Sequence, residues 1–304
     1  MSVPDRIVAV VGPTASGKSS LAVAIAQRLG TAEIVNADSM QLYRGMDIGT
    51  AKPTEAERGG VRHHLFDVLD VTETATVAQF QSWARTAIDD CRARGVTPVL
   101  VGGSALYVRA VLDPLEFPGT DPAVRARWTA ELAERGPEAL HAELARQDPA
   151  AAAQILATND RRVVRALEVI ELTGRPFAAS MPPYASIHPT TLLGLRVPRD
   201  VLDVRLAERV DRMWADGFVD EVRGLVPLGI EDGLTAAKAI GYQQVLAFLR
   251  GEMTEDEARE ATVTGTRKFA RRQDRLFVKD PRITWLPHDA EDLVDRAMTV
   301  VTRA

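Results

Sequence analysis

Near the start of the chain, eight consecutive residues fit the pattern G-x-x-x-x-G-K-[ST] of a phosphate-binding loop. Glycines let backbone N–H groups curl around an anion, and a helix that begins at the loop adds a positive dipole. In this pattern the lysine contacts terminal phosphoryl oxygens and the last hydroxyl holds Mg²⁺. A glycine-rich turn without a ligand is the alternative, but a buried strand before the loop and a helix after it disfavour it. The predicted loop consists of Gly12, Pro13, Thr14, Ala15, Ser16, Gly17, Lys18 and Ser19.

Strands and helices alternate around this loop. A capping box at Thr76 opens a helix that runs to about residue 94, and the residues between 45 and 76 have the composition of a long functional loop. Such alternation predicts a parallel sheet covered by helices. We therefore expect an α/β protein with a P-loop NTPase-like parallel sheet flanked by helices. The first half has predicted strands at 7–11, 33–36 and 98–101, and a helix at 18–29.

After residue 113 the pattern changes to a proline-rich linker and then to an alanine-rich, all-helical segment. Asp121-Pro122 is a typical helix start, and Asn159 and Gly174 are expected to cap a later helix. We assign 118–189 to a helical insert, and 1–117 with 190–304 to the catalytic core. The core then continues with predicted strands at 191–197 and 283–286, and with helices at 200–216, 220–226, 235–250, 254–275 and 291–301.

The composition is ordinary for a globular protein, with 46% hydrophobic and 26% charged residues. The single cysteine, Cys91, excludes a disulfide framework or a cysteine-based zinc site within the chain. No signal peptide or membrane-length apolar run is recognisable, so we expect a cytoplasmic enzyme. The net charge of −5 argues weakly against a nucleic-acid partner, but the segment 267–282 has seven basic and two acidic residues, a local charge of +5.

Asp38 follows the second predicted strand. Ligands of an open parallel sheet gather beyond the carboxyl ends of its strands, so topology places this carboxylate near the phosphate loop. There it can bind Mg²⁺ or accept a proton from an attacking nucleophile. The structural alternative is an Asx-turn that only closes the strand.

The segment from Asp38 to Pro53 reads DSMQLYRGMDIGTAKP. Together with the phosphate loop, it resembles the signature of the tRNA dimethylallyltransferases, also called tRNA isopentenyltransferases. Five further segments resemble motifs of that family, so the resemblance covers almost the whole chain. These segments are HHLFD at 63–67, GGSALY at 102–107, NDRRVVRALEV at 159–169, AIGYQ at 239–243 and TRKFARRQ at 266–273.

The resemblance implies transfer of a dimethylallyl group from dimethylallyl diphosphate to N6 of adenosine 37, next to the anticodon of tRNAs that read codons beginning with U. Charge accumulates on the departing diphosphate, where backbone N–H groups, Lys18 and Mg²⁺ stabilise it. Thr14, Gly17, Lys18 and Ser19 match the family's diphosphate cradle, and Ser19 is the expected Mg²⁺ ligand. Asp38 matches the residue that orients and deprotonates the adenine amine. The target base must first leave its stack.

The family also has an arginine that meets the diphosphate, on the helix predicted at 200–216. Arg205 and Arg209 lie one turn apart there, on one face. We favour Arg209, and a solvated charged face is the alternative. The resemblance further implies phosphate and base contacts to a tRNA anticodon stem-loop. The residues expected at that interface are Asp38, Ser39, Met40, Gln41, Ser104, Arg125, Arg161, Arg162, Arg165, Gln243, Arg267, Lys268, Arg271, Arg272 and Gln273.

The chain departs from the family's pattern in several places. Ser104 replaces a threonine but keeps its hydroxyl, and Ala105 replaces a glycine. A tryptophan usual near Leu276 is missing, so its local contact is lost or shifted, and no C-terminal zinc finger is recognisable. The pair His63-His64 has no third metal ligand at a suitable spacing, so we expect it to pack in the loop or to face RNA.

Rival functions use the same phosphate loop. A small-molecule or nucleoside kinase would place ATP there, but no arginine-rich lid is recognisable. An adenylate isopentenyltransferase, which prenylates free nucleotides, would share the cradle but would not need the helical insert or the basic cluster at 267–275. A nucleotide-binding switch should carry a motif such as N-K-x-D, which is absent. We therefore expect a monomer that binds tRNA and dimethylallyl diphosphate but no membrane.

Overall fold

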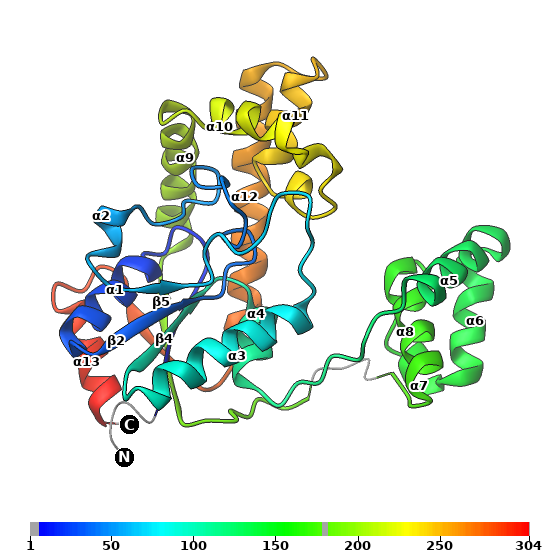
Figure 1. Cartoon of the computed structure of the whole chain (residues 1–304), viewed down its shortest axis with the longest axis horizontal. Helices are drawn as coiled ribbons and strands as arrows, with labels where there is room; N and C mark the ends of the chain where they lie inside the picture. Colours follow the sequence, from blue (N-terminus) through cyan, green and yellow to red (C-terminus); the bar gives the residue numbers. More distant parts are fainter. Residues whose placement is uncertain (1–5, 178–181, 304) are drawn as a thin grey trace. The chain divides into compact units, whose positions relative to one another are not determined.

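The computed structural model describes residues 6–177 and 182–303. It divides into two compact units, shown in Figure 1. Unit 1 comprises Met1–Pro114 and Tyr184–Ala304, and unit 2 comprises Leu115–Pro183. In the described part of the chain, no helix combines the length and apolarity needed to cross a membrane.

Unit 1 is built on a sheet of six parallel strands in the order β3-β2-β4-β1-β5-β6. The central strand β1 pairs with β4 on one side and β5 on the other, with Val8 opposite Val99 and Thr191. Every residue of β1 is buried, which explains its continuous apolar sequence. The strands are β1 (Ile7–Val11), β2 (Ala32–Asn36), β3 (His63–His64), β4 (Thr97–Gly102), β5 (Thr190–Arg196) and β6 (Ile283–Pro287).

Helices cover both faces of the sheet, as the predicted P-loop-like fold requires. On one face, α1 (Lys18–Leu29) and α13 (Leu293–Arg303) pack on Val8, Val10 and their neighbours. On the other face, α3 (Val77–Ala93) and α4 (Ala105–Leu112) pack on Ala9, Val35 and Leu100. Thr76 caps α3 with the predicted capping box. The alternating side chains of the strands therefore separate into two cores.

Four helices complete unit 1: α9 (Arg199–Ala215), α10 (Phe218–Leu225), α11 (Tyr242–Leu249) and α12 (Glu255–Phe277). The single helix predicted at 235–250 is wrong. A 3₁₀ turn at Ala236–Lys238 is followed by an extended residue, and α11 begins only after Gly241. Gly241 has φ of 92°, which the interior of a right-handed helix does not allow. Two more 3₁₀ turns lie at Val226–Leu228 and Ile230–Asp232.

The segment predicted as a long loop before Thr76 contains a short helix, α2 (Glu55–Arg58), and the two-residue strand β3. Neither was predicted, because both are shorter than any hydrophobic period that a sequence can display. β3 forms the sheet edge, where Ile34 pairs with His63 and Val35 with His64. Through this pairing the two histidines belong to the sheet.

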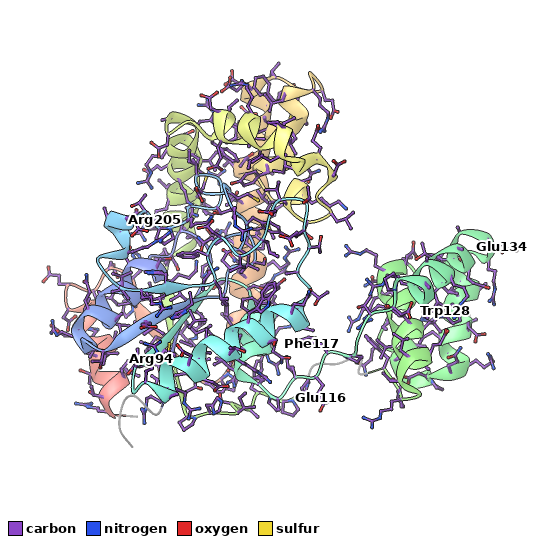
Figure 2. All side chains as sticks on the ribbon, in the orientation of Figure 1. Arg94, Glu116, Phe117, Trp128, Glu134 and Arg205 are labelled. Carbon is purple, nitrogen blue, oxygen red and sulfur yellow. The ribbon has the colours of Figure 1, made fainter. Side chains whose placement is uncertain are left out.

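Unit 2 is a small helical bundle of α5 (Pro122–Arg135), α6 (Pro137–Gln147), α7 (Pro149–Ala152) and α8 (Asp160–Thr173). Trp128, labelled in Figure 2, lies in its apolar core with Leu140 and Leu167. Asp121 caps α5 as expected, whereas Asn159 precedes α8 without a side-chain capping bond. The carboxylate of Glu168 is fully buried and pairs with Arg125 and Arg165.

Candidate active site

A pocket of about 510 Å³, open to solvent, lies where the strands of unit 1 end at their carboxyl termini. It brings together the phosphate loop, the residues after β2 and β3, the end of β4 and one arginine of α9. The lining residues are Thr14, Lys18, Ser19, Ile34, Asn36, Asp38, Gln41, Thr50, Ala51, Pro53, His63, Phe66, Val101, Gly102 and Arg209.

The phosphate loop has the backbone that an anion cradle requires. Gly17 caps α1 in the left-handed conformation with φ of 94°, and Lys18 is the first residue of the helix. Ala15 has φ of 62°, which is uncommon for a residue with a side chain. Within the described residues, the buried hydroxyl of Ser16 has no hydrogen-bond partner. Strained backbone of this kind concentrates at functional sites.

Two cationic side chains converge in the pocket, Lys18 from α1 and Arg209 from α9. Among the described residues, neither has a carboxylate within ion-pair distance; Lys18 Nζ donates to Pro13 O at 3.3 Å and Arg209 donates to Thr50 O at 3.4 Å. The pKa of Lys18 is lowered to about 8, chiefly because burial disfavours its charged form; the negative charge of Asp38 opposes the shift and Arg209 adds to it. Burial also lowers the pKa of Arg209. The pocket is therefore built to receive an anion.

Arg205 and Arg209, the two candidates for contact with the diphosphate, have different surroundings in the structure. Arg209 lines the pocket, and its charge acts on Lys18. Arg205, labelled in Figure 2, instead lies 3.2 Å from His288 Nδ1. Spacing on the helix did not separate the two residues, because positions four apart share one face.

Asp38 faces the same pocket in a fixed orientation. Its Oδ1 accepts the backbone N–H of Met40 at 3.0 Å, while its own N–H donates to Asn36 Oδ1 at 2.9 Å. The Asx-turn is therefore present, but it leaves the second carboxylate oxygen available to a ligand. Asn36 Nδ2 also donates to Leu65 O, at 3.1 Å, so that one amide joins the segments after β2 and β3.

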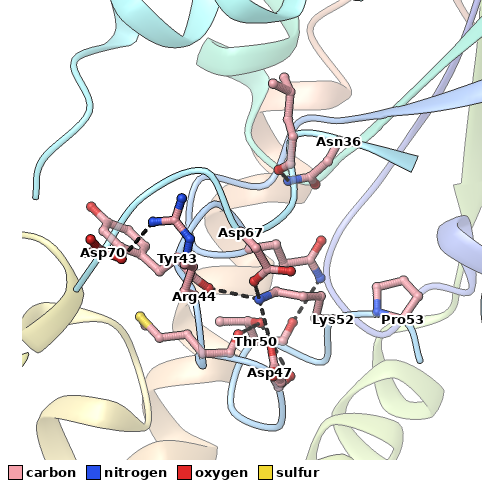
Figure 3. Close-up of polar contacts among 12 residues, drawn as sticks. Asn36, Tyr43, Arg44, Asp47, Thr50, Lys52, Pro53, Asp67 and Asp70 are labelled. Carbon is pink, nitrogen blue, oxygen red and sulfur yellow. Dashed lines mark hydrogen bonds and ion pairs between the residues drawn. The ribbon is translucent and has the colours of Figure 1, made fainter. Parts of the chain in front are cut away.

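The loop from Ser39 to Pro53 forms one wall of the pocket and is held by a buried ammonium, shown in Figure 3. Lys52 Nζ donates to Tyr43 O at 2.9 Å and to the carboxylates of Asp47 and Asp67 at 2.6 Å each. Its side chain is only 3% exposed. The cluster ties the loop to the segment after β3.

A second set of hydrogen bonds holds the same loop, and its acceptor, Glu221, lies on α10. The carboxylate of Glu221 accepts the backbone N–H groups of Asp47, Ile48 and Gly49 at 2.6–3.2 Å, and the hydroxyl of Tyr242 at 2.5 Å. A side chain at Gly49 would overlap the ring of Phe218. The loop is therefore fixed from both sides, and its backbone carbonyl at Thr50 accepts from Arg209 and Gln41.

Gln273, predicted to contact tRNA bases, is placed differently. Its side chain is buried at 4% exposure, and its Oε1 accepts the backbone N–H of Thr14 at 2.9 Å. Its Nε2 fills the space that a side chain at Gly103 would need. Gln273 therefore joins α12 to the phosphate loop and to the turn after β4. No local sequence signal announces this contact, because its partners lie far away in the chain.

The other residues predicted to contact tRNA fall into two groups. Lys268, Arg271, Arg272, Gln243, Arg161 and Arg162 are exposed, and Ser39, Met40, Gln41 and Ser104 are partly buried in unit 1. Several of these arginines have internal partners: Arg125 and Arg165 pair with Glu168, Arg267 donates to Asp203 O at 3.2 Å, and Arg271 lies 3.7 Å from an Asp203 carboxylate oxygen. These side chains contribute to their own unit whatever else they bind.

His63 and His64 have separate environments. His63 lines the pocket. His64 Nε2 lies 2.7 Å from Glu33 Oε2, in a cluster with Cys91. Arg94 binds both oxygens of Glu33 and lowers the pKa of that carboxyl to about 2, while burial raises the pKa of the Cys91 thiol to about 12. The cluster therefore works as an internal ion-pair network between β2, β3 and α3.

Comparison with known proteins gives one consistent family. The sequence model of the IPP transferase family matches residues 41–280. A tRNA dimethylallyltransferase of Thermobifida fusca is 63% identical over 301 residues, covering 98% of this chain and 94% of that protein. One of Streptomyces avermitilis is 61% identical over 290 residues, covering 95% and 93%.

Solved structures agree. The tRNA isopentenylpyrophosphate transferase of Bacillus halodurans is similar with a TM-score of 0.72 and 40% identity, covering 98% of this chain and 95% of that chain. A eukaryotic dimethylallyltransferase whose structures capture it acting on tRNA is similar with a TM-score of 0.80 and 25% identity, covering 97% and 77%.

The buried hydrogen bonds of Lys52 to Tyr43, Asp47 and Asp67 lead to a prediction about stability. Lys52→Met removes one buried ammonium and its three hydrogen bonds, so we expect the free energy of unfolding to fall by about 1–3 kcal/mol. Urea denaturation measures this. Arg44→Ala is the matched control, because it breaks an exposed ion pair with Asp70 and should cost less than about 1 kcal/mol. An equal fall in the free energy of unfolding in the two variants would show that the buried Lys52 contacts contribute no more than an exposed ion pair.

Proposed function

The chain belongs to the IPP transferase family, and on that premise we propose that it transfers a dimethylallyl group from dimethylallyl diphosphate to N6 of adenosine 37 of tRNA. The tRNAs are those that read codons beginning with U, and diphosphate is released. The observation that carries the proposal is that two cations, Lys18 and Arg209, line one pocket with Asp38, whose charge acts on both. The full-length similarity to tRNA dimethylallyltransferases supports it.

The diphosphate occupies the loop Gly12–Ser19. Backbone N–H groups at the start of α1 face its oxygens, and Lys18 and Arg209 neutralise the charge that grows as the C1–O bond breaks. Both cations are already partly buried in the pocket, so little reorganisation is needed when that charge appears. Such groups bind the departing diphosphate more strongly than the intact substrate, which is the condition for acceleration.

Asp38 acts on the nucleophile. The adenine N6 amine forms the new N–C1 bond, the electron pair of the C1–O bond leaves with diphosphate, and the amine proton passes to the Asp38 carboxylate. An exocyclic amine is a poor nucleophile, so its alignment matters as much as its deprotonation. The bonds from Asn36 and Met40 fix Asp38 for that purpose.

The donor set at the phosphate loop fits Mg²⁺. The hydroxyl of Ser19 lines the pocket beside Asp38, and Mg²⁺ prefers oxygen ligands combined with substrate phosphates. Ser19 would hold the ion together with diphosphate oxygens. When bound, Mg²⁺ supplies charge stabilisation to the leaving group.

The tRNA anticodon stem-loop binds through exposed cations on α12 and through the helical insert, which we place at 118–189 between the core segments 1–117 and 190–304. Lys268, Arg271, Arg272 and Arg161 offer phosphate contacts. Adenosine 37 is turned out of its stack to reach Asp38. We propose that the protein acts as a monomer, and tRNA as substrate supports action in the cytoplasm.

The direct test is incubation of the protein with unmodified tRNA and dimethylallyl diphosphate, followed by mass spectrometry of the tRNA nucleosides. ATP with free nucleosides runs beside it as the control for a kinase. We expect Asp38→Asn to lower turnover by about 10²–10⁴-fold, because it removes the proton acceptor. The same change removes a negative charge from the pocket, so dimethylallyl diphosphate should bind at least as tightly as before. Near-normal turnover in Asp38→Asn would reject the proposed base.

The pKa of Lys18 near 8 predicts a pH dependence. The free ammonium loses its proton as pH rises through about 8, whereas bound diphosphate holds the proton on. Affinity for dimethylallyl diphosphate should therefore be constant well below pH 8 and fall by up to tenfold per pH unit above it. The terminal phosphate is already ionised there, since its second pKa is near 6. Isothermal titration in two buffers at pH 8.5 should detect proton uptake, and Lys18→Met should abolish it. Uptake that persists in Lys18→Met would assign the proton to another group.

The exposed cations of α12 predict a salt dependence for tRNA binding. Replacing Arg271 and Arg272 by alanine should weaken binding and lower the slope of log K against log salt by about 0.7–0.9 for each lost phosphate contact. Filter binding across salt concentrations measures this. The matched control replaces Arg28 and Arg296, which form exposed ion pairs on α1 and α13. An unchanged slope in the Arg271/Arg272 variant would remove these residues from the interface.

A further inference from the structure

One side of the pocket is apolar and has no part in the steps above. Phe66 and His63 line it, together with Pro53 and Ile34. The pKa of His63 is lowered, chiefly because burial disfavours the charged imidazole. A pocket lined by two cations and by two aromatic rings matches a ligand with an anionic head and an apolar tail.

The aromatic wall is held rigidly. The rings of Phe66 and His63 stack with centroids 5.4 Å apart and an interplanar angle of 21°. The guanidinium of Arg58 lies 5.0 Å from the Phe66 centroid and donates to Pro53 O at 3.0 Å. His63 Nδ1 lies 2.8 Å from Val61 O. A wall fixed in this way can limit the size of what it contacts.

The backbone on both sides of Phe66 is strained. Leu65 and Asp67, its two neighbours, have φ of 65° and 57°, values that residues with side chains rarely adopt. Asn36 fixes the carbonyl of Leu65, and Lys52 fixes the carboxylate of Asp67. Such strain persists only where the surroundings impose it, and it clusters at ligand sites. The two strained residues flank Phe66, which lines the pocket.

The order of the strands places the wall at the correct end. Along the sheet edge the phosphate loop follows β1, Asp38 follows β2, and Phe66 follows β3, with β4 between the first two. At about 4.8 Å per strand, roughly 14 Å separate β1 from β3. Asp38 thus lies between the cationic and the aromatic ends. A substrate whose reacting carbon sits beside Asp38 extends its diphosphate toward β1 and its carbon chain toward β3.

We propose that Phe66, stacked on His63, receives the five-carbon chain of the prenyl diphosphate and limits its length, which makes Phe66 a specificity-determining residue. This inference rests on the proposed function. We expect the ten-carbon geranyl diphosphate to be a poorer substrate, because its added isoprene unit would meet the stacked rings of Phe66 and His63.

The two ends of the pocket can be tested separately by comparing the binding of inorganic diphosphate with the binding of dimethylallyl diphosphate. In Phe66→Ala, affinity for dimethylallyl diphosphate should fall about tenfold or more, because an apolar contact of several methylene groups is lost. Affinity for inorganic diphosphate should be unchanged, which also reports that the variant is folded. Phe248→Ala on α11, outside the pocket lining, is the matched control and should change neither affinity.

Selectivity gives the second measurement. The ratio of kcat/KM for geranyl diphosphate to that for dimethylallyl diphosphate, with tRNA as acceptor, should rise at least about tenfold in Phe66→Ala. Phe66→Trp narrows the same space, so it should lower kcat/KM for dimethylallyl diphosphate with diphosphate affinity unchanged. If Phe66→Ala alters neither the ratio nor the binding of dimethylallyl diphosphate, the wall does not contact the chain. Absence of any prenyl transfer by the wild-type protein would instead reject the proposed function.

Discussion

Two partly buried cations in one pocket, Lys18 and Arg209, are the physical constraint on which the site depends. Removing Lys18 and Arg209 from water costs free energy, and the lowered pKa of Lys18 is the visible sign of that cost. An anion that binds between the two cations offsets this free energy. The pocket therefore binds most strongly the diphosphate group, whose negative charge increases during the reaction. Lys18 begins α1 and Arg209 lies on α9, almost two hundred residues later in the chain. The parallel sheet is what brings them to one edge.

The surroundings of the pocket hold this arrangement in place. Lys52 and Glu221 fix the loop from Ser39 to Pro53 from opposite sides, and that loop supplies the carbonyl that Arg209 contacts. The non-glycine residues with positive φ are Ala15, Ala51, Leu65 and Asp67 within the described ranges, and all four lie in or beside segments that line the pocket. Strain gathered at one place is tolerated because many hydrogen bonds overdetermine the backbone there. Such preorganisation lowers the cost of aligning a weak nucleophile with its electrophile.

The sequence predicted the parts of this site that depend on local patterns. β1 and α1 have the predicted bounds, because a buried strand and an amphipathic helix each carry a clear period, and the capping box at Thr76 marked the start of α3. Features that depend on distant partners were not predictable. Gln273 was assigned to RNA because nothing in its neighbourhood reveals its bond to Thr14. β3 was not predicted, because a segment of two residues becomes a strand only by pairing with β2. The turn before Gly241 was missed because the apolar pattern continues through it while the backbone does not.

The position of Gln273 links the two substrates of the proposed reaction through one helix. α12 exposes Lys268, Arg271 and Arg272, and the next residue along the chain directs its amide into the core against the phosphate loop. The helix therefore carries three exposed positive charges and its contact with the phosphate loop within six residues. A helix turn is stiff, so its exposed and buried faces move together. The net charge of −5 is no obstacle to RNA binding, since the segment 267–282 has a local charge of +5.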